Sequence, residues 1–188
     1  MDNYIELANR TKSDKFFGNR VGRLELQQTL SDAVGILERL DAIKKSLFYG
    51  KDSSLVPNLE GNNAIRNCVD VPLRIELDVL HCILGKATES GEMMEMLLNV
   101  IANDQPFDRT NFIEELGDSE WYTAIGARTV GITLSEIQSI NIAKLQKRFP
   151  DKFTTETAIN RDLNGERAVL EQSQNPGIAD AQEMLRKH

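Results

Sequence analysis

Two pairs of carboxylates stand out in the sequence because each pair is spaced to share one face of a helix. Glu89 and Glu92 are three residues apart, and so are Glu115 and Asp118; side chains at this spacing are neighbours on a helix surface. The midpoint between the pairs falls in a turn-like stretch at residues 103–106. An antiparallel pair of helices would therefore bring all four carboxylates within about one helical turn of each other.

The helix that carries Glu115 should point its carboxylates inward. Glu115 and Asp118 share a stripe with Tyr122 and Ile125 on a helical wheel, and a stripe with large apolar groups faces a core. Buried carboxylates repel each other and lose hydration, and a divalent cation would offset both costs. Oxygen ligands alone favour Mg²⁺, with Mn²⁺ as a substitute. The Glu89 pair lies on a polar arc, which leaves both a metal site and a solvated surface open.

A third group of polar residues lies near the end of the motif region. Asn141, Lys144 and Arg148 fall within about 60° of each other on a wheel, in the sector that also carries apolar residues. This arrangement favours a phosphate pocket, in which Arg148 would hold two oxygens and Lys144 would act as a compact charge. The alternative is that these side chains snorkel at the rim of a core.

These residues form three motifs, E-x-x-E, E-x-x-D and N-x-x-K-L-x-x-R, which occur in this order within residues 81–150. In order and spacing the sequence resembles the MazG-like, all-α nucleotide pyrophosphohydrolases. The resemblance implies a helical bundle, assembled as a dimer or a dimer of dimers, whose carboxylates bind Mg²⁺ that engages a nucleoside triphosphate. It assigns the metal ligands as Glu89, Glu92, Glu115 and Asp118. It assigns the substrate contacts as Asn141, Lys144 and Arg148.

Three further residues are weaker substrate-binding candidates. Lys86 could reach a phosphate, and Trp121 or Tyr122 could stack on a base. Aromatic residues at helical spacing are more often part of a core, so packing is the competing interpretation for both.

The composition excludes several classes of function. The chain has 188 residues and a formal net charge of −7, the wrong sign for a protein that grips a nucleic-acid polymer. Phosphate-loop, dinucleotide-binding and zinc-protease motifs are absent, and only two histidines are present. Neither Cys68 nor Cys82 has metal-ligand spacing, so both are expected to be reduced core residues. No apolar run approaches a membrane span, and we expect a cytoplasmic protein, in the host cytoplasm if phage-encoded.

Apolar residues at three- and four-residue spacing predict an all-α fold. We expect a MazG-like helical bundle with an extra N-terminal segment and a helical C-terminal tail. The third helix should begin at Asp108 or at Asn111, which has capping-box spacing to Glu114. The predicted helices cover residues 22–49, 72–102, 108–130, 134–149 and 155–171, followed by a short piece after Pro176.

The domain organisation follows from these elements. We expect a polar lead-in at residues 1–21, a catalytic domain at 22–150 and a C-terminal tail at 151–188. The catalytic domain would contain a long connection at 51–71, rich in Asn, Ser, Gly and Pro.

The residues and the resemblance together predict a Mg²⁺-dependent nucleoside triphosphate pyrophosphohydrolase. Water would attack the α-phosphorus, positioned by Glu89 or Glu92, and a nucleoside monophosphate and pyrophosphate would be released. One alternative keeps the metal site but acts on an alarmone, a cyclic nucleotide or phosphoribosyl-ATP. The other is a non-catalytic helical interaction protein with a merely solvated acidic stripe.

Overall fold

The computed structural model describes residues 3–56 and 73–172, and within these ranges the chain is helical with no β-strand. The predicted all-α class is therefore confirmed. None of the described helices is long and apolar enough to cross a membrane. The described residues divide into two compact units, one within Asn19–Gly131 and the other within Met1–Gly18 and Ile132–His188.

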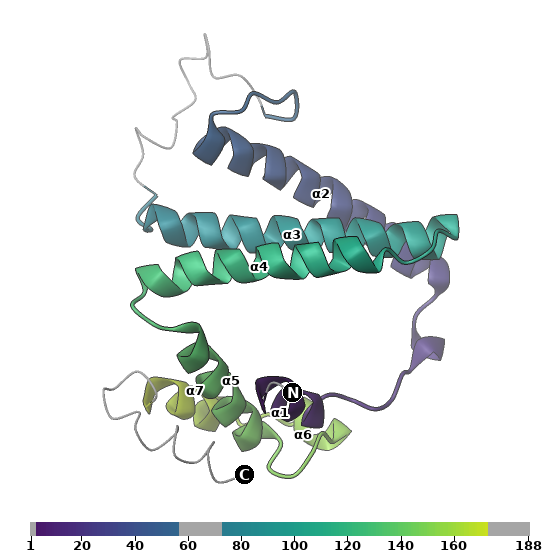
Figure 1. The fold of residues 1–188 in the computed structure, drawn as a ribbon. Coiled ribbons are helices and arrows are strands. Elements are labelled where there is room, and N and C mark those ends of the chain that lie inside the picture. Colours follow the sequence, from purple (N-terminus) through teal and green to yellow (C-terminus); the bar gives the residue numbers. More distant parts are fainter. Residues whose placement is uncertain (1–2, 57–72, 173–188) are drawn as a thin grey trace. The chain divides into compact units, whose positions relative to one another are not determined.

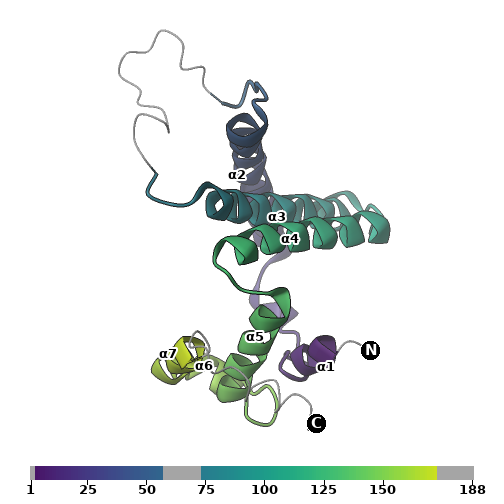
Figure 2. The same ribbon diagram turned by 60° about the vertical axis from the view of Figure 1, so that its left-hand side comes forward.

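The Asn19–Gly131 unit contains three long helices: α2 (Arg23–Tyr49), α3 (Leu77–Asn103) and α4 (Arg109–Thr129). Helix α3 packs against both α2 and α4, and α3 and α4 lie side by side along their length (Figures 1 and 2). The connection between α3 and α4 is short, so the two helices run antiparallel. Buried apolar side chains such as Leu30, Val34 and Ala127 form the core.

The ends of these helices explain where the predicted boundaries were wrong. Helix α3 begins at Leu77 rather than at Pro72, because Arg74 has a φ of 53° and interrupts a right-handed helix. Of the two predicted starts for α4, the structure selects Asp108, whose side chain accepts hydrogen bonds from the backbone of Thr110 and Asn111, each at 3.0 Å. This is an ordinary N-cap.

The second unit contains α1 (Asn3–Arg10), α5 (Leu134–Arg148), α6 (Thr155–Ile159) and α7 (Leu163–Gln172). Helix α5 contacts both α1 and α7. It begins with a capping box in which Thr133 and Glu136 satisfy each other's backbone amides. It ends just before Phe149, which is buried.

The expected polar lead-in contains a helix, α1, which is held to α5 by a 3.0 Å hydrogen bond from Asn141 to the Tyr4 hydroxyl. One prediction about this unit was wrong. The single helix expected over 155–171 is two, because Asp162 accepts a hydrogen bond from the Gly165 amide and starts a new helix.

The two units also divide the chain differently from the expected domains. We expected one domain over 22–150, whereas α5 belongs with the helices of the chain ends. The described Cys82 is a free, half-buried thiol. Cys68, most of the predicted connection at 51–71 and the short piece after Pro176 lie outside the described residues.

Candidate metal site

Three of the four predicted carboxylates meet between α3 and α4. Oxygens of Glu89, Glu92 and Glu115 all lie within 4.8 Å of one another. Glu89 and Glu115 are buried, whereas Glu92 is exposed at the edge of the cluster. The antiparallel packing of α3 and α4 thus produces the convergence that the spacing predicted, and one accessible carboxylate opens it to solvent.

Asp118 lies beyond this group of three. It is one turn further along α4 and is exposed. Its charge still contributes to the raised pKa of Glu115, so it lies within electrostatic reach of the cluster. Its assignment as a metal ligand stays a prediction.

Burial and mutual repulsion raise the pKa values of two carboxylates of the cluster, Glu115 and Glu92. Burial, followed by the negative charge of Glu92 and a hydrogen bond with Glu89, raises the pKa of Glu115 to about 7. Burial also raises the pKa of Glu92, followed by the charge of Glu89. A divalent cation would offset the repulsion between these carboxylates, and it prefers oxygen ligands such as these. The donor set therefore fits a divalent cation.

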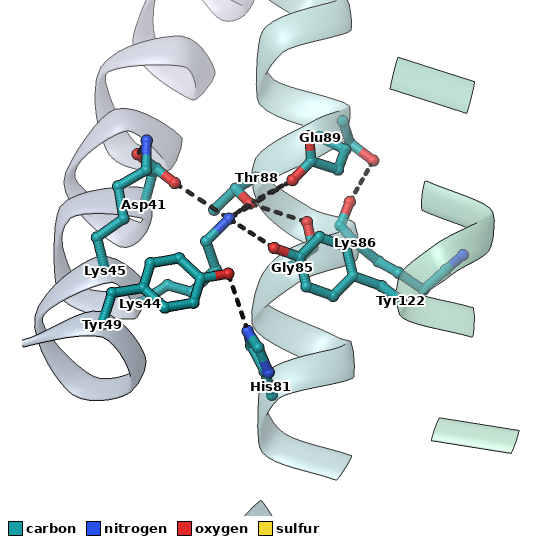
Figure 3. A network of polar contacts seen from close by, with 11 residues as sticks. Asp41, Lys44, Lys45, Tyr49, His81, Gly85, Lys86, Thr88, Glu89 and Tyr122 are labelled. Carbon is teal, nitrogen blue, oxygen red and sulfur yellow. Dashed lines mark hydrogen bonds and ion pairs between the residues drawn. The ribbon is translucent and has the colours of Figure 1, made fainter. Parts of the chain in front are cut away.

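A buried lysine that the sequence analysis missed lies directly beside the cluster. The Lys44 ammonium, on α2, reaches Thr88 Oγ1 at 2.7 Å and Glu89 Oε1 at 3.5 Å, both on α3 (Figure 3). It also lies 3.2 Å from the Tyr122 hydroxyl on α4 and 3.1 Å from Asp41 Oδ1 on its own helix. This one side chain therefore joins all three helices at the site.

The polar surroundings keep Lys44 charged. Burial alone would lower its pKa, but hydrogen bonds to Tyr122 and Asp41 outweigh burial and raise the pKa above its ordinary value. Burial raises the pKa of Tyr122 to about 12, so the phenol is neutral. One signal in the sequence points to Lys44: it continues the stripe of Leu30, Val34 and Leu37, where a core residue is expected.

The cluster borders two hollows. The larger, of about 420 Å³, lies between α2 and α3; the smaller is about 290 Å³ and lies beside the turn between α3 and α4. Glu92 and Glu95 line both. The larger is also lined by Val34, Leu37, Glu38, Asp41, Leu55, Thr88 and Gly91. A small molecule in either hollow would have Glu92 within reach.

The weaker candidates have structural partners. The Lys86 ammonium donates hydrogen bonds to Thr123 Oγ1 at 2.6 Å and to Ser119 at 3.2 Å, which ties α3 to α4. Tyr122 is buried, with its hydroxyl on Lys44. Trp121 is 52% exposed and touches the edge of the Tyr122 ring. Packing therefore accounts for Tyr122 and Lys86, and Trp121 keeps a free face.

The predicted phosphate contacts lie on α5, in the other unit. Asn141 donates to Tyr4, and no ion pair joins Lys144 to another described residue. Arg148 donates through Nε and Nη2 to the two oxygens of Glu166, at 2.9 and 2.5 Å. That these three residues face the carboxylates stays a prediction.

Glu166 is a second residue that the sequence analysis did not identify. It is buried on α7, and Arg161 also contacts both its oxygens, at 3.3 and 2.7 Å. The hydrogen bonds from Arg148 and then Arg161 lower its pKa to about 2. Two arginines on one buried carboxylate hold α7 against α5.

Comparison of the chain with family models, curated proteins and solved structures finds no match. The resemblance to MazG-like enzymes therefore rests on the three motifs alone and stays a prediction.

The cluster predicts how stability should depend on pH without metal. Because the pKa of Glu115 is raised to about 7, the folded protein keeps a proton that the unfolded chain releases above its ordinary carboxyl pKa. The free energy of unfolding should therefore fall as pH rises from 5.5 to 7.5, by up to about 1.4 kcal/mol per pH unit from this group. Urea unfolding in EDTA should show that Glu115→Gln loses this contribution while Glu114→Gln, at an exposed neighbour, keeps it. Parallel pH curves for wild type and Glu115→Gln would contradict it.

The Glu166 pair predicts a stability cost at Arg148. Arg148→Ala removes one of two partners from a buried carboxylate, so unfolding should become easier by about 3 kcal/mol. Arg167→Ala breaks an exposed pair with Glu171 and should cost less than about 0.5 kcal/mol. Urea unfolding of both variants measures this. Equal losses would show that the Glu166 pair is not what stabilises this unit.

Proposed function

We propose that the protein is a Mg²⁺-dependent nucleoside triphosphate pyrophosphohydrolase, which converts a (deoxy)nucleoside triphosphate and water to the monophosphate and pyrophosphate. The observation that carries the proposal is the convergence of Glu89, Glu92 and Glu115 oxygens within 4.8 Å at the edge of an open hollow. The order and spacing of the three motifs supports it independently.

The carboxylates would hold the cation: Glu89, Glu92 and Glu115, with Asp118 from the next turn of α4. When bound, Mg²⁺, or Mn²⁺ in its place, would neutralise phosphate charge and make the α-phosphorus more electrophilic. Glu89 is engaged by Lys44 and Thr88. Glu92 is exposed and lines both hollows.

Glu92 is therefore the better placed of the two candidates to orient the attacking water and accept its proton. Its raised pKa suits a general base. The water oxygen forms a bond to the α-phosphorus, the bond from that phosphorus to the α–β bridging oxygen breaks, and pyrophosphate leaves with the electron pair.

The leaving pyrophosphate needs hydrogen-bond donors and positive charge, for which we propose the α5 residues Asn141, as an amide donor, and Lys144 and Arg148, as cations. Lys144 is half-buried and has no ion pair among the described residues. Arg148 uses Nε and Nη2 on Glu166, so its Nη1 donors are not used in that pair. Charge at these positions would matter most as the leaving group develops.

We also propose that protomers pair, as a homodimer or a dimer of dimers. Large apolar side chains are exposed on the two helices that carry the carboxylates, including Ile83 and Leu97 on α3 and Ile113 and Leu116 on α4. A second copy is one way to cover them. Light scattering of the full chain should give at least twice the monomer mass of 21.1 kDa. A monomer at the concentration used in activity assays would contradict the proposal.

The decisive experiment is a panel of nucleotides with Mg²⁺, followed by pyrophosphate and phosphate release. Glu92→Gln and Asp118→Asn should each lower kcat/KM by about 100-fold or more, with little change in helical content. Glu114→Gln is the matched control. Glu114 is exposed and directly precedes Glu115 on α4, and the kcat/KM of this variant should stay near that of the wild type.

The outcomes of this panel separate the alternatives. Turnover of an alarmone, a cyclic nucleotide or phosphoribosyl-ATP in place of triphosphates would keep the site and change the substrate. No turnover of any nucleotide, with no effect of Mg²⁺ on melting, would favour a non-catalytic helical protein.

A further inference from the structure

The role of Lys44 is not explained by the proposed reaction, although its ammonium contacts Glu89 of the cluster. Its side chain is only 4% exposed, and it enters the site from α2, while the carboxylates come from α3 and α4. Burying an ammonium group is costly unless it is paired and hydrogen-bonded. A lysine at such a position therefore needs a compensating role in the site.

The contacts of Lys44 leave no donor for a substrate. A lysine ammonium has three hydrogens, and Lys44 makes three hydrogen bonds, to Thr88, Tyr122 and Glu89, at 2.7, 3.2 and 3.5 Å. Asp41 adds an ion pair at 3.1 Å. Lys44 is thus a positioning residue, which acts on the site through Glu89 and not by touching a substrate.

Glu89 links Lys44 to the rest of the cluster. Its Oε1 faces Lys44 and Thr88, and a Glu89 carboxylate oxygen lies within 4.8 Å of oxygens of both Glu92 and Glu115. The positive charge therefore lies next to the most buried side of three mutually repelling carboxylates.

We propose that Lys44 is a built-in counterion of the carboxylate cluster, which holds Glu89 in place in the metal-free protein and lowers the affinity of the empty site for Mg²⁺. A fixed positive charge stabilises the folded cluster when no cation is present. The same charge repels an incoming dication at short range, because Lys44 and Glu89 are both buried and water screens their charges weakly. The part of this inference that concerns Mg²⁺ rests on the proposed function; the part that concerns the metal-free protein does not.

The neighbouring lysine provides a matched control. Lys45 also pairs with Asp41, is more exposed than Lys44, and does not contact Glu89 among the described interactions. Effects that arise from the loss of an Asp41 partner should appear in variants of both lysines. Effects that arise from Glu89 should appear only in variants of Lys44.

The test is a double-mutant cycle on the full chain, melted in EDTA. Lys44→Met keeps the stem and removes the charge, and it should lower the melting temperature by about 5 °C or more. Adding Glu89→Gln to it should restore part of that loss, because the carboxylate left without a counterion is removed. Adding Glu89→Gln to Lys45→Met should give no such recovery.

A cycle in which Lys44→Met with Glu89→Gln melts no higher than Lys44→Met alone would overturn the proposal and assign Lys44 to packing. If Lys44→Met does not fold in EDTA, the double variant still decides: folding supports the counterion, and failure to fold overturns it.

Calorimetric titration with Mg²⁺ and no nucleotide is the second measurement. Lys44→Met should bind Mg²⁺ at least about fivefold more tightly than wild type, and unchanged or weaker binding would overturn the proposed effect on affinity. If the wild type binds no Mg²⁺, the proposed metal site fails. The cycle in EDTA then decides the counterion role alone.

Discussion

Like charges gathered where water is scarce are the constraint on which the α2–α4 unit depends. Three carboxylates within 4.8 Å repel one another, and burial and this repulsion together raise the pKa values of Glu92 and Glu115. The charged and polar groups at this site come from all three helices. Helices α3 and α4 supply the acids, α2 supplies the Lys44 ammonium, and Thr88 and Tyr122 complete the hydrogen bonds around that charge.

Close packing makes these contacts reachable. A Cβ on Gly85 would overlap the Tyr122 ring, and a Cβ on Gly91 would overlap Leu37. Both glycines lie on the central helix α3, one toward α4 and the other toward α2. They let the neighbouring side chains approach the α3 backbone, which brings Lys44 and Glu115 to the same stretch of α3. The close packing at these two glycines is therefore also what brings the charged groups of this unit together.

In the second unit a buried carboxylate also needs compensation, but there the positive charges outnumber the negative one. A single buried carboxylate, Glu166, meets two guanidinium groups, and its pKa falls to about 2 where that of Glu115 rises to about 7. The side chains are of one type, and only their neighbours differ. This pairing gives the C-terminal tail a structural reason to be present, and it accounts for an Arg148 orientation that does not require a bound phosphate.

Local sequence determined the helices and the register of the carboxylates on them. Three-residue spacing and the short turn after Asn103 bring Glu89, Glu92 and Glu115 to the same level of the antiparallel helices α3 and α4, since both facts are properties of single helices and one connection. Local signals also set the C-terminal end of α2, at Gly50, and the N-terminal end of α5, at the Thr133–Glu136 capping box.

Only the tertiary structure decided which charges meet across helices. Lys44 and Glu89 are far apart in sequence, as are Arg148 and Glu166, and no periodicity within one helix specifies such a partner. A lysine or glutamate in an apolar stripe predicts burial or snorkelling equally well; the choice depends on whether a neighbouring helix brings an opposite charge. The same reason explains why α5 joins the chain ends: Arg148 and Asn141 find their partners Glu166 and Tyr4 there, and partner choice is a property of the folded chain.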